Sequence, residues 1–169
     1  MDAWQRLDAA SEADARELLT ACGGSARWVE RMLSHRPFGS DEQLQTMARQ
    51  EWFALGPDDW REAFRHHPKI GDRESLRARF PKTADLSADE QRGVAAASER
   101  TLDALAEANR AYEERFGYIF IVCATGKSAE EMLARLCERL NNDPQEELLI
   151  AAGEHAKITE LRLRRVAGS

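Results

Sequence analysis

This sequence lacks the features that build membrane proteins, disulfide scaffolds and nucleic-acid-binding proteins. Its longest apolar run, residues 118–124, is far too short to cross a bilayer. Its three cysteines are odd in number and form no CxxC pair, so neither a disulfide framework nor a zinc ribbon is indicated. Acidic residues (30) outnumber basic ones (24), and the charges are interleaved without a basic stripe. A nucleic-acid partner is therefore not expected.

Signals for export and for membrane attachment are equally scarce. The N-terminus is acidic and has no apolar core around Trp4, so we expect no signal peptide. Residues 166–169 carry no peroxisomal or lipidation signal. Together with the odd number of cysteines and their lack of CxxC spacing, these features predict a cytoplasmic protein that acts without a membrane partner.

Most of the local patterns that the sequence does contain are start and stop signals of helices. Serine, aspartate or proline precedes stretches of helical periodicity, and glycine, asparagine or proline ends them. Residues 118–123 are the only strand-like run, being β-branched and aromatic. The predicted helices are residues 12–22, one capped by Ser25, one from 41 to about 56, one from 57 into His66, and 73–80, 88–116, 129–140 and 144–166.

The length of 169 residues allows one domain with a substantial core, and no repeat, low-complexity tract or linker divides it. We therefore expect a single all-α domain over residues 1–169. It should be a bundle of about seven to nine helices. One short buried extended segment would line the functional site.

The stretch with the strongest chemical character is HHPKIG at residues 66–71. Pro68 fixes its own φ and pushes His67 out of the helical region, and Gly71 permits a turn. An imidazolium at a helix C-terminus is also favoured by the helix dipole, which is the structural explanation for these histidines. The proline and glycine favour a functional one, because they specify the backbone around a side chain that titrates near neutral pH.

Ser87, Glu90 and Gln91 stand at the start of the predicted long helix. The spacing Ser-x-x-Glu is a capping box, and spacing alone favours that structural role. The same place offers free backbone N–H groups and the positive end of the helix dipole, which suit an anion. Glu90 and Gln91 would add an acceptor and an amide that both donates and accepts.

Two further stretches carry weaker signals. TGKS at residues 125–128 looks like half of a phosphate-binding loop, but the full pattern needs glycine where Ile121 stands. A strand without a partner in residues 120–124 would leave backbone groups that a flat polar ligand could bind, and Cys123 in this apolar run is expected to be an inert buried thiol. In the last predicted helix, one inward-facing arginine could hold a carboxylate.

Four of these stretches together resemble the 2-oxo-4-hydroxy-4-carboxy-5-ureidoimidazoline (OHCU) decarboxylase family of urate degradation. They are HPKIG at 67–71, SADEQ at 87–91, FIVCA at 120–124 and ELRL at 160–163. Each is weak alone, but their order and spacing are specific together, and the resemblance extends over nearly the whole chain. His66 departs from it, at a position that is more often small.

The resemblance implies release of CO₂ from OHCU to give (S)-allantoin, by an all-α enzyme that uses no metal or organic cofactor and commonly forms a homodimer. It makes His67 the catalytic imidazole that donates or accepts a proton, with Glu90 as the second catalytic residue. The residues implied to bind substrate are Pro68, Ser87, Glu90, Gln91, Phe120, Ile121, Val122, Cys123, Ala124 and Arg162.

Two other functions stay open at this point. A metal-dependent hydrolase could use His66 and His67, but it needs further ligands, and His35 and His155 have no metal-binding spacing. A helical interaction module could use the tryptophans as anchors, although aromatic residues at helical spacing are more often core. The tryptophans are Trp4, Trp28, Trp52 and Trp60.

Overall fold

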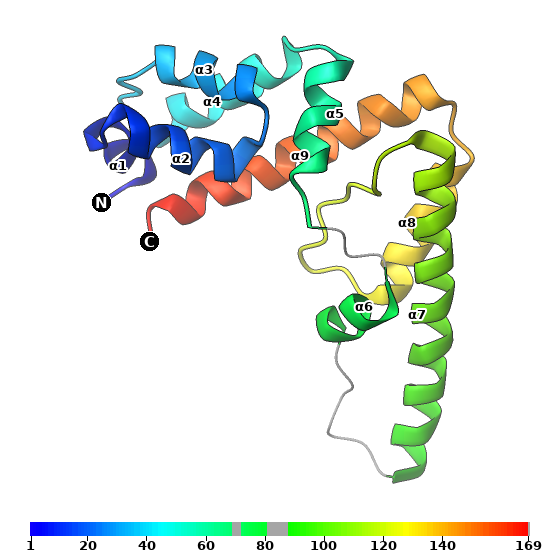
Figure 1. The fold of residues 1–169 in the computed structure, drawn as a ribbon. Coiled ribbons are helices and arrows are strands. Elements are labelled where there is room, and N and C mark those ends of the chain that lie inside the picture. The colour runs from blue at the N-terminus through cyan, green and yellow to red at the C-terminus, as the bar shows by residue number, and fades with distance from the viewer. Residues whose placement is uncertain (69–71, 81–87, 169) are drawn as a thin grey trace. The chain divides into compact units, whose positions relative to one another are not determined.

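Nine α-helices make up the part of the chain that the computed structural model describes, and no β-strand occurs in that part (Figure 1). The described residues are 1–68, 72–80 and 88–168, without the side chains of position 73 and positions 88–98. No helix in these ranges is long and apolar enough to span a membrane. The all-α class and the expected number of helices are confirmed. The helices are α1 (Ala3–Ala9), α2 (Glu12–Gly23), α3 (Ala26–Ser34), α4 (Asp41–Phe53), α5 (Pro57–Arg65), α6 (Arg73–Arg79), α7 (Ala88–Phe116), α8 (Ala129–Leu140) and α9 (Pro144–Val166).

Local capping explains most helix boundaries. The hydroxyls of Ser11, Ser25 and Ser128 each accept a hydrogen bond from the backbone N–H three residues later, at 3.1, 3.3 and 3.1 Å. Helix α2 is followed by Gly24 with φ 79°, and α7 by Gly117 with φ 83°, a conformation that glycine adopts without steric cost. Because these signals are local, the predicted helix ends lie close to the observed ones.

Helix α1 was not among the predicted helices. The backbone N–H of Asp2 donates to Gln5 Oε1 at 2.8 Å, and that of Trp4 donates to Asp41 Oδ1 at 3.0 Å. Leu7 is fully buried, whereas Trp4 is half-buried. An Asp-x-x-Gln pair before a single buried leucine is the signal that could have indicated this short helix.

The chain forms two compact units. The first contains Met1–His67, Ile121–Cys123 and Leu148–Ser169, and the second contains Pro68–Phe120 and Ala124–Glu147. That residues 1–169 make one domain stays a prediction.

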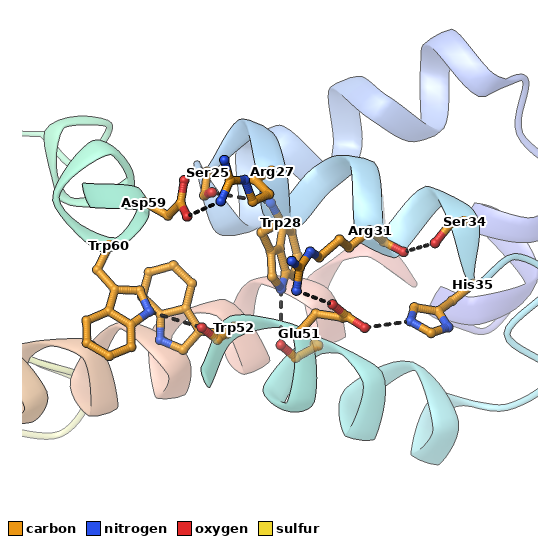
Figure 2. A network of polar contacts seen from close by, with 11 residues as sticks. Ser25, Arg27, Trp28, Arg31, Ser34, His35, Glu51, Trp52, Asp59 and Trp60 are labelled. Carbon is orange, nitrogen blue, oxygen red and sulfur yellow. Dashed lines mark hydrogen bonds and ion pairs between the residues drawn. The ribbon is translucent and has the colours of Figure 1, made fainter. Parts of the chain in front are cut away.

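Buried tryptophans join the helices of the first unit. The indole N–H of Trp28 donates to Ala48 O at 3.0 Å, and that of Trp60 donates to Trp52 O at 3.0 Å (Figure 2). The indole N–H of Trp52 donates to Ala152 O at 2.9 Å, which ties α4 to α9. All three rings are buried, so they are core residues rather than anchors for a partner.

A carboxylate on α4 adds a polar contact between helices of this unit. Glu51 accepts from Arg31 Nη1 at 3.3 Å and from His35 Nε2 at 2.8 Å (Figure 2). The hydrogen bond from His35 is the main cause that lowers the pKa of Glu51, and burial opposes it. These contacts connect α4 with α3 and the residue that follows it.

The second unit contains a buried ion pair. Glu147, which is fully buried, accepts from Arg139 Nη2 at 2.6 Å and from the Tyr112 hydroxyl at 2.5 Å. The Arg139 guanidinium also lies over the Phe120 ring, at 4.5 Å from its centroid. These contacts fix α7, α8 and the first turn of α9 to one another.

The strand-like run at residues 118–123 forms no strand, which corrects that part of the prediction. A β-strand is stabilised by a neighbouring strand, and the described chain offers none. A side chain binds the backbone instead, since the N–H of Cys123 donates to Glu154 Oε1 at 3.2 Å. Tyr118 and Ile121 are buried as expected, whereas Cys123 is only half-buried.

Candidate active site

His67 lies just beyond the end of α5. The backbone N–H groups of His66 and His67 donate to Ala63 O and Phe64 O at 3.1 and 3.2 Å, so the chain leaves the helix in a tightened turn. His66 is exposed, whereas His67 is half-buried. Of the two neighbouring imidazoles, His67 is therefore the one that the first unit encloses.

Two side chains of α9, far from His67 in the sequence, meet at its ring. Its Nε2 lies 2.7 Å from Nδ1 of His155 on α9. The other nitrogen of His155, Nε2, lies 2.9 Å from the carbonyl oxygen of Gly23 at the end of α2. Nη2 of Arg162 lies 3.4 Å from Nδ1 of His67. All four residues belong to the first unit.

The helical repeat of α9 explains why two of these residues converge. His155 and Arg162 are separated by seven residues, or about two turns, and so lie on one face of the helix. Arg162 is half-buried on that face, whereas Arg164 and Arg165 are exposed. The position of Arg162 along α9 thus directs its side chain toward His67.

Burial makes both histidines neutral near pH 7. It lowers the pKa of His67 to about 4, and the charges of Arg162 and His66 act in the same direction. It lowers the pKa of His155 to about 3, with His67 as the next largest cause. Burial also lowers the pKa of Arg162, but a guanidinium stays charged in proteins. The arrangement is a neutral base beside a fixed cation.

Arg162 has no carboxylate partner among the residues that the structure describes. It lines a cavity of about 450 Å³ in the first unit, together with His155, His66, Gly24 and Thr20 among others. A half-buried cation beside a cavity favours an anionic ligand, because a carboxylate would offset the cost of its desolvation.

Within the described ranges, no three histidine, cysteine or carboxylate side chains are placed to hold a metal ion. His67 and His155 point their nitrogens at each other at 2.7 Å, which is a hydrogen-bond distance with no room for an ion between them. Cys22 is not an activated thiol either, since burial raises its pKa to about 11 despite the opposing charge of Arg162.

The remaining predicted site residues are divided between the two units. Phe120 and Ala124 are half-buried, and Pro68 is exposed, in the second unit. In the first unit, Ile121 is buried, and Val122 and Cys123 are half-buried.

The predicted residues at the start of the long helix are not tested by the structure. Ser87 lies outside the described residues, as do Lys69, Ile70 and Gly71 of the turn. Glu90 and Gln91 lie in α7, but their side chains are outside the described part. The choice between a helix cap and a substrate ligand stays open for these side chains.

His155 and Glu154 are the residues of this region that the sequence did not single out. His155 has no metal-binding spacing, and its partner His67 is 88 positions away, so no local pattern joins the two. The spacing of seven residues between His155 and Arg162, which puts both on one face of a helix, is the signal that could have indicated His155 as a site residue. Glu154 precedes His155 and binds the backbone of Cys123.

Comparisons with known proteins point to one family. A family model described as OHCU decarboxylase matches residues 8–164. The uric acid degradation bifunctional protein TTL of Arabidopsis thaliana is 40% identical over 146 residues, which cover 86% of this chain and 45% of that protein. The 2-oxo-4-hydroxy-4-carboxy-5-ureidoimidazoline decarboxylase of Amia calva is 31% identical over 134 residues, covering 79% of this chain and 75% of that protein. The chain therefore spans less than half the length of the bifunctional relative.

Two solved structures are similar to this one. The crystal structure of an OHCU decarboxylase in the presence of (S)-allantoin matches with a TM-score of 0.72 and 35% identity, and the match covers 95% of this chain and 100% of that one. The crystal structure of an (S)-allantoin synthase matches with a TM-score of 0.68 and 19% identity, over 95% of this chain and 52% of that one, which shows a shared fold.

Proposed function

Because the chain belongs to the OHCU decarboxylase family, we propose that it converts OHCU into (S)-allantoin and CO₂. The structural observation that carries the proposal is the pair formed by His67 and Arg162. A neutral imidazole lies 3.4 Å from a cation that no described carboxylate neutralises. This arrangement suits a substrate that brings its own carboxylate and needs a proton moved.

The chemistry of the substrate sets the tasks of the enzyme. Breaking the bond between carbon and the carboxylate releases CO₂ and leaves an electron pair on the ring carbon. The conjugated C=N and carbonyl groups of the substrate accept that pair, and the ring nitrogen takes up a proton from solvent. The hydroxyl then becomes a carbonyl as its proton moves to the neighbouring ring carbon. Since the substrate is its own electron sink, we infer that orientation, electrostatics and protonation from one side are enough, without a cofactor.

Arg162 and His67 divide these tasks. The Arg162 guanidinium binds an anionic or carbonyl oxygen of the substrate through paired N–H donors. Fixing the ring and the carboxylate together holds the breaking bond perpendicular to the π system, where its electrons can enter the ring. His67 takes up the proton of the neighbouring hydroxyl and returns a proton to carbon. A positioned acid–base group of this kind contributes roughly 10²–10⁴-fold to the rate.

The other predicted residues complete the proposed substrate site. Glu90 would accept hydrogen bonds from substrate N–H groups, and Gln91 would bind the ureido arm or ring amide. Pro68, Ser87 and residues 120–124 would line the site, the last with backbone groups. Support for these assignments is the family resemblance of the motifs that contain them.

The test is turnover of freshly generated OHCU, followed by the circular dichroism of (S)-allantoin. We expect His67→Asn to lower the rate by roughly 10²–10⁴-fold, because it removes the acid–base group. His35→Asn is the control, since it changes an imidazole that contacts Glu51 and does not line the cavity beside Arg162, and it should keep most of the rate. A wild-type rate in His67→Asn would show that the catalytic assignment is wrong.

Two further measurements separate the alternatives. If folded Glu90→Ala keeps its turnover and loses only thermal stability, Glu90 is a cap and not a catalytic residue. Loss of turnover after chelator treatment, restored by a divalent metal, would favour the metal-dependent hydrolase instead.

We also infer that the protein is a cytoplasmic homodimer built from one domain over residues 1–169. No disulfide joins the three cysteines to one another, which is consistent with a reducing compartment. Light scattering of the purified chain tests the dimer, and a monomer at micromolar concentration would contradict it.

A further inference from the structure

The mechanism above does not use His155, a buried polar residue that contacts His67 directly. His155 is only 1% exposed, and its ring stacks on Trp52 with centroids 4.3 Å apart and planes at 26°. The Phe64 ring lies 5.8 Å from it at an interplanar angle of 59°, and the His67 ring meets it edge-on at 4.8 Å. These aromatic contacts fix the plane of the His155 ring, so its two nitrogens have defined directions.

Both nitrogens of His155 are used, and one partner has a fixed role. The carbonyl oxygen of Gly23 can only accept a hydrogen bond, so the proton of neutral His155 is on Nε2, 2.9 Å from that oxygen. A neutral imidazole has a single N–H, which leaves Nδ1 of His155 as an acceptor. Nδ1 faces Nε2 of His67 at 2.7 Å, so the proton of His67 must be on Nε2.

The opposite end of the chain of hydrogen bonds leads to the same assignment. A guanidinium can only donate, and Nη2 of Arg162 lies 3.4 Å from Nδ1 of His67. Nδ1 of His67 is then the acceptor, and the proton of His67 is again on Nε2. The other tautomer of His67 would bring a lone pair against the lone pair of His155 and an N–H against a cation.

We propose that His155 is a positioning residue that holds His67 in its Nε2–H tautomer, so that Nδ1 beside Arg162 is the atom that exchanges protons with the substrate. This inference rests on the proposed function of His67. With the Arg162 guanidinium bound to the substrate carboxylate, the substrate hydroxyl gives its proton to Nδ1. The Nε2–H bond to His155 then stabilises the imidazolium that forms. Since the Gly23 carbonyl cannot take that proton away, it leaves from Nδ1 to carbon, on the same side of the substrate.

Two substitutions of His155 distinguish its hydrogen bond with His67 from its hydrogen bond with the Gly23 carbonyl. His155→Asn puts an amide oxygen one bond from Cγ, where Nδ1 stands, and so keeps the acceptor for His67. His155→Gln puts its amide group near the place of Nε2, which keeps the donor for Gly23 and removes the acceptor. Both variants lose the stacked ring, so a general loss of packing would affect them alike.

The direct readout is the tautomer of His67, measured by long-range ¹H–¹⁵N NMR of ¹⁵N-histidine-labelled protein at pH 7.5 without substrate. We expect the Nε2–H form in the wild type and in His155→Asn, and a mixture of tautomers in His155→Gln. We also expect kcat of His155→Gln to fall by roughly 10- to 100-fold with little change in KM, the range for partners that orient a functional histidine. His155→Asn should keep kcat within a few-fold of the wild type.

Two results would overturn the inference. One is a wild-type His67 protonated on Nδ1, which needs no variant to fold. The other is a folded His155→Gln with the wild-type tautomer and kcat. The outcome is independent of the proposed function, because the tautomer is measured without substrate, whereas failure of the wild type to make (S)-allantoin would reject the function alone.

Discussion

Lowering the pH from 7.5 to 5 should destabilise this protein through its two buried imidazoles. Burial lowers the pKa of His67 to about 4 and that of His155 to about 3 in the folded state. In the unfolded chain both return to an ordinary value of about 6.5. The unfolded state therefore binds more protons below pH 6.5, and the free energy of unfolding falls as the pH falls.

The magnitude follows from the two pairs of pKa values. At pH 5 a histidine with a pKa of about 6.5 unfolded and about 4 folded loses about 2 kcal/mol of stability, at 1.36 kcal/mol per unit. The pair together should lose about 4 kcal/mol. The loss begins near pH 6.5 and is complete near the folded pKa values. Glu51, whose pKa is lowered from 4.5, acts only below this window.

Urea unfolding followed by far-ultraviolet circular dichroism between pH 7.5 and 5 measures this effect. His155→Gln removes one of the buried imidazoles, so its pH-dependent loss should be about half that of the wild type. His66→Gln changes an exposed imidazole and should keep the wild-type dependence. An unfolding free energy that is flat from pH 7.5 to 5 in the wild type would refute the reasoning from burial.

Two substitutions test contacts inside the units, one within the second unit and one within the first. Glu147→Gln leaves the buried Arg139 without its carboxylate, and we expect it to lower the unfolding free energy by roughly 3–5 kcal/mol in thermal and urea unfolding. Gly23→Ala places a Cβ 2.4 Å from the Trp28 ring, so overpacking should cost about 1–3 kcal/mol and change the tryptophan fluorescence.

Each of these substitutions has a matched control. Glu146→Gln changes the exposed carboxylate beside Glu147 and should be nearly neutral. Gly153→Ala adds a Cβ that meets nothing within 4 Å inside α9 and should leave stability equal or higher. Equal effects in a variant and its control would mean that the buried ion pair or the tryptophan contact is not the cause.

Most helix boundaries could be predicted, because the groups that set them are neighbours in sequence. Ser25 binds an N–H three residues later, and Gly117 ends α7 through its own φ. The prediction of a strand at residues 118–123 is wrong, since β-branched and aromatic side chains favour a strand only where another strand is available for pairing. Its backbone is bound by Glu154 instead, 31 positions further along the chain.

The sequence by itself determined most of the helices, the family resemblance and the choice of His67. The caps, the proline beside an imidazole and the family motifs are all local features of the sequence. Only the tertiary structure decided which atoms His67 meets. Its contacts with His155 and Arg162 span 88 and 95 positions, and the contact of His155 with Gly23 spans 132. No local periodicity encodes such separations. They arise because apolar burial packs α2, α5 and α9 of the first unit together, and that packing also fixes which nitrogen of His67 holds its proton.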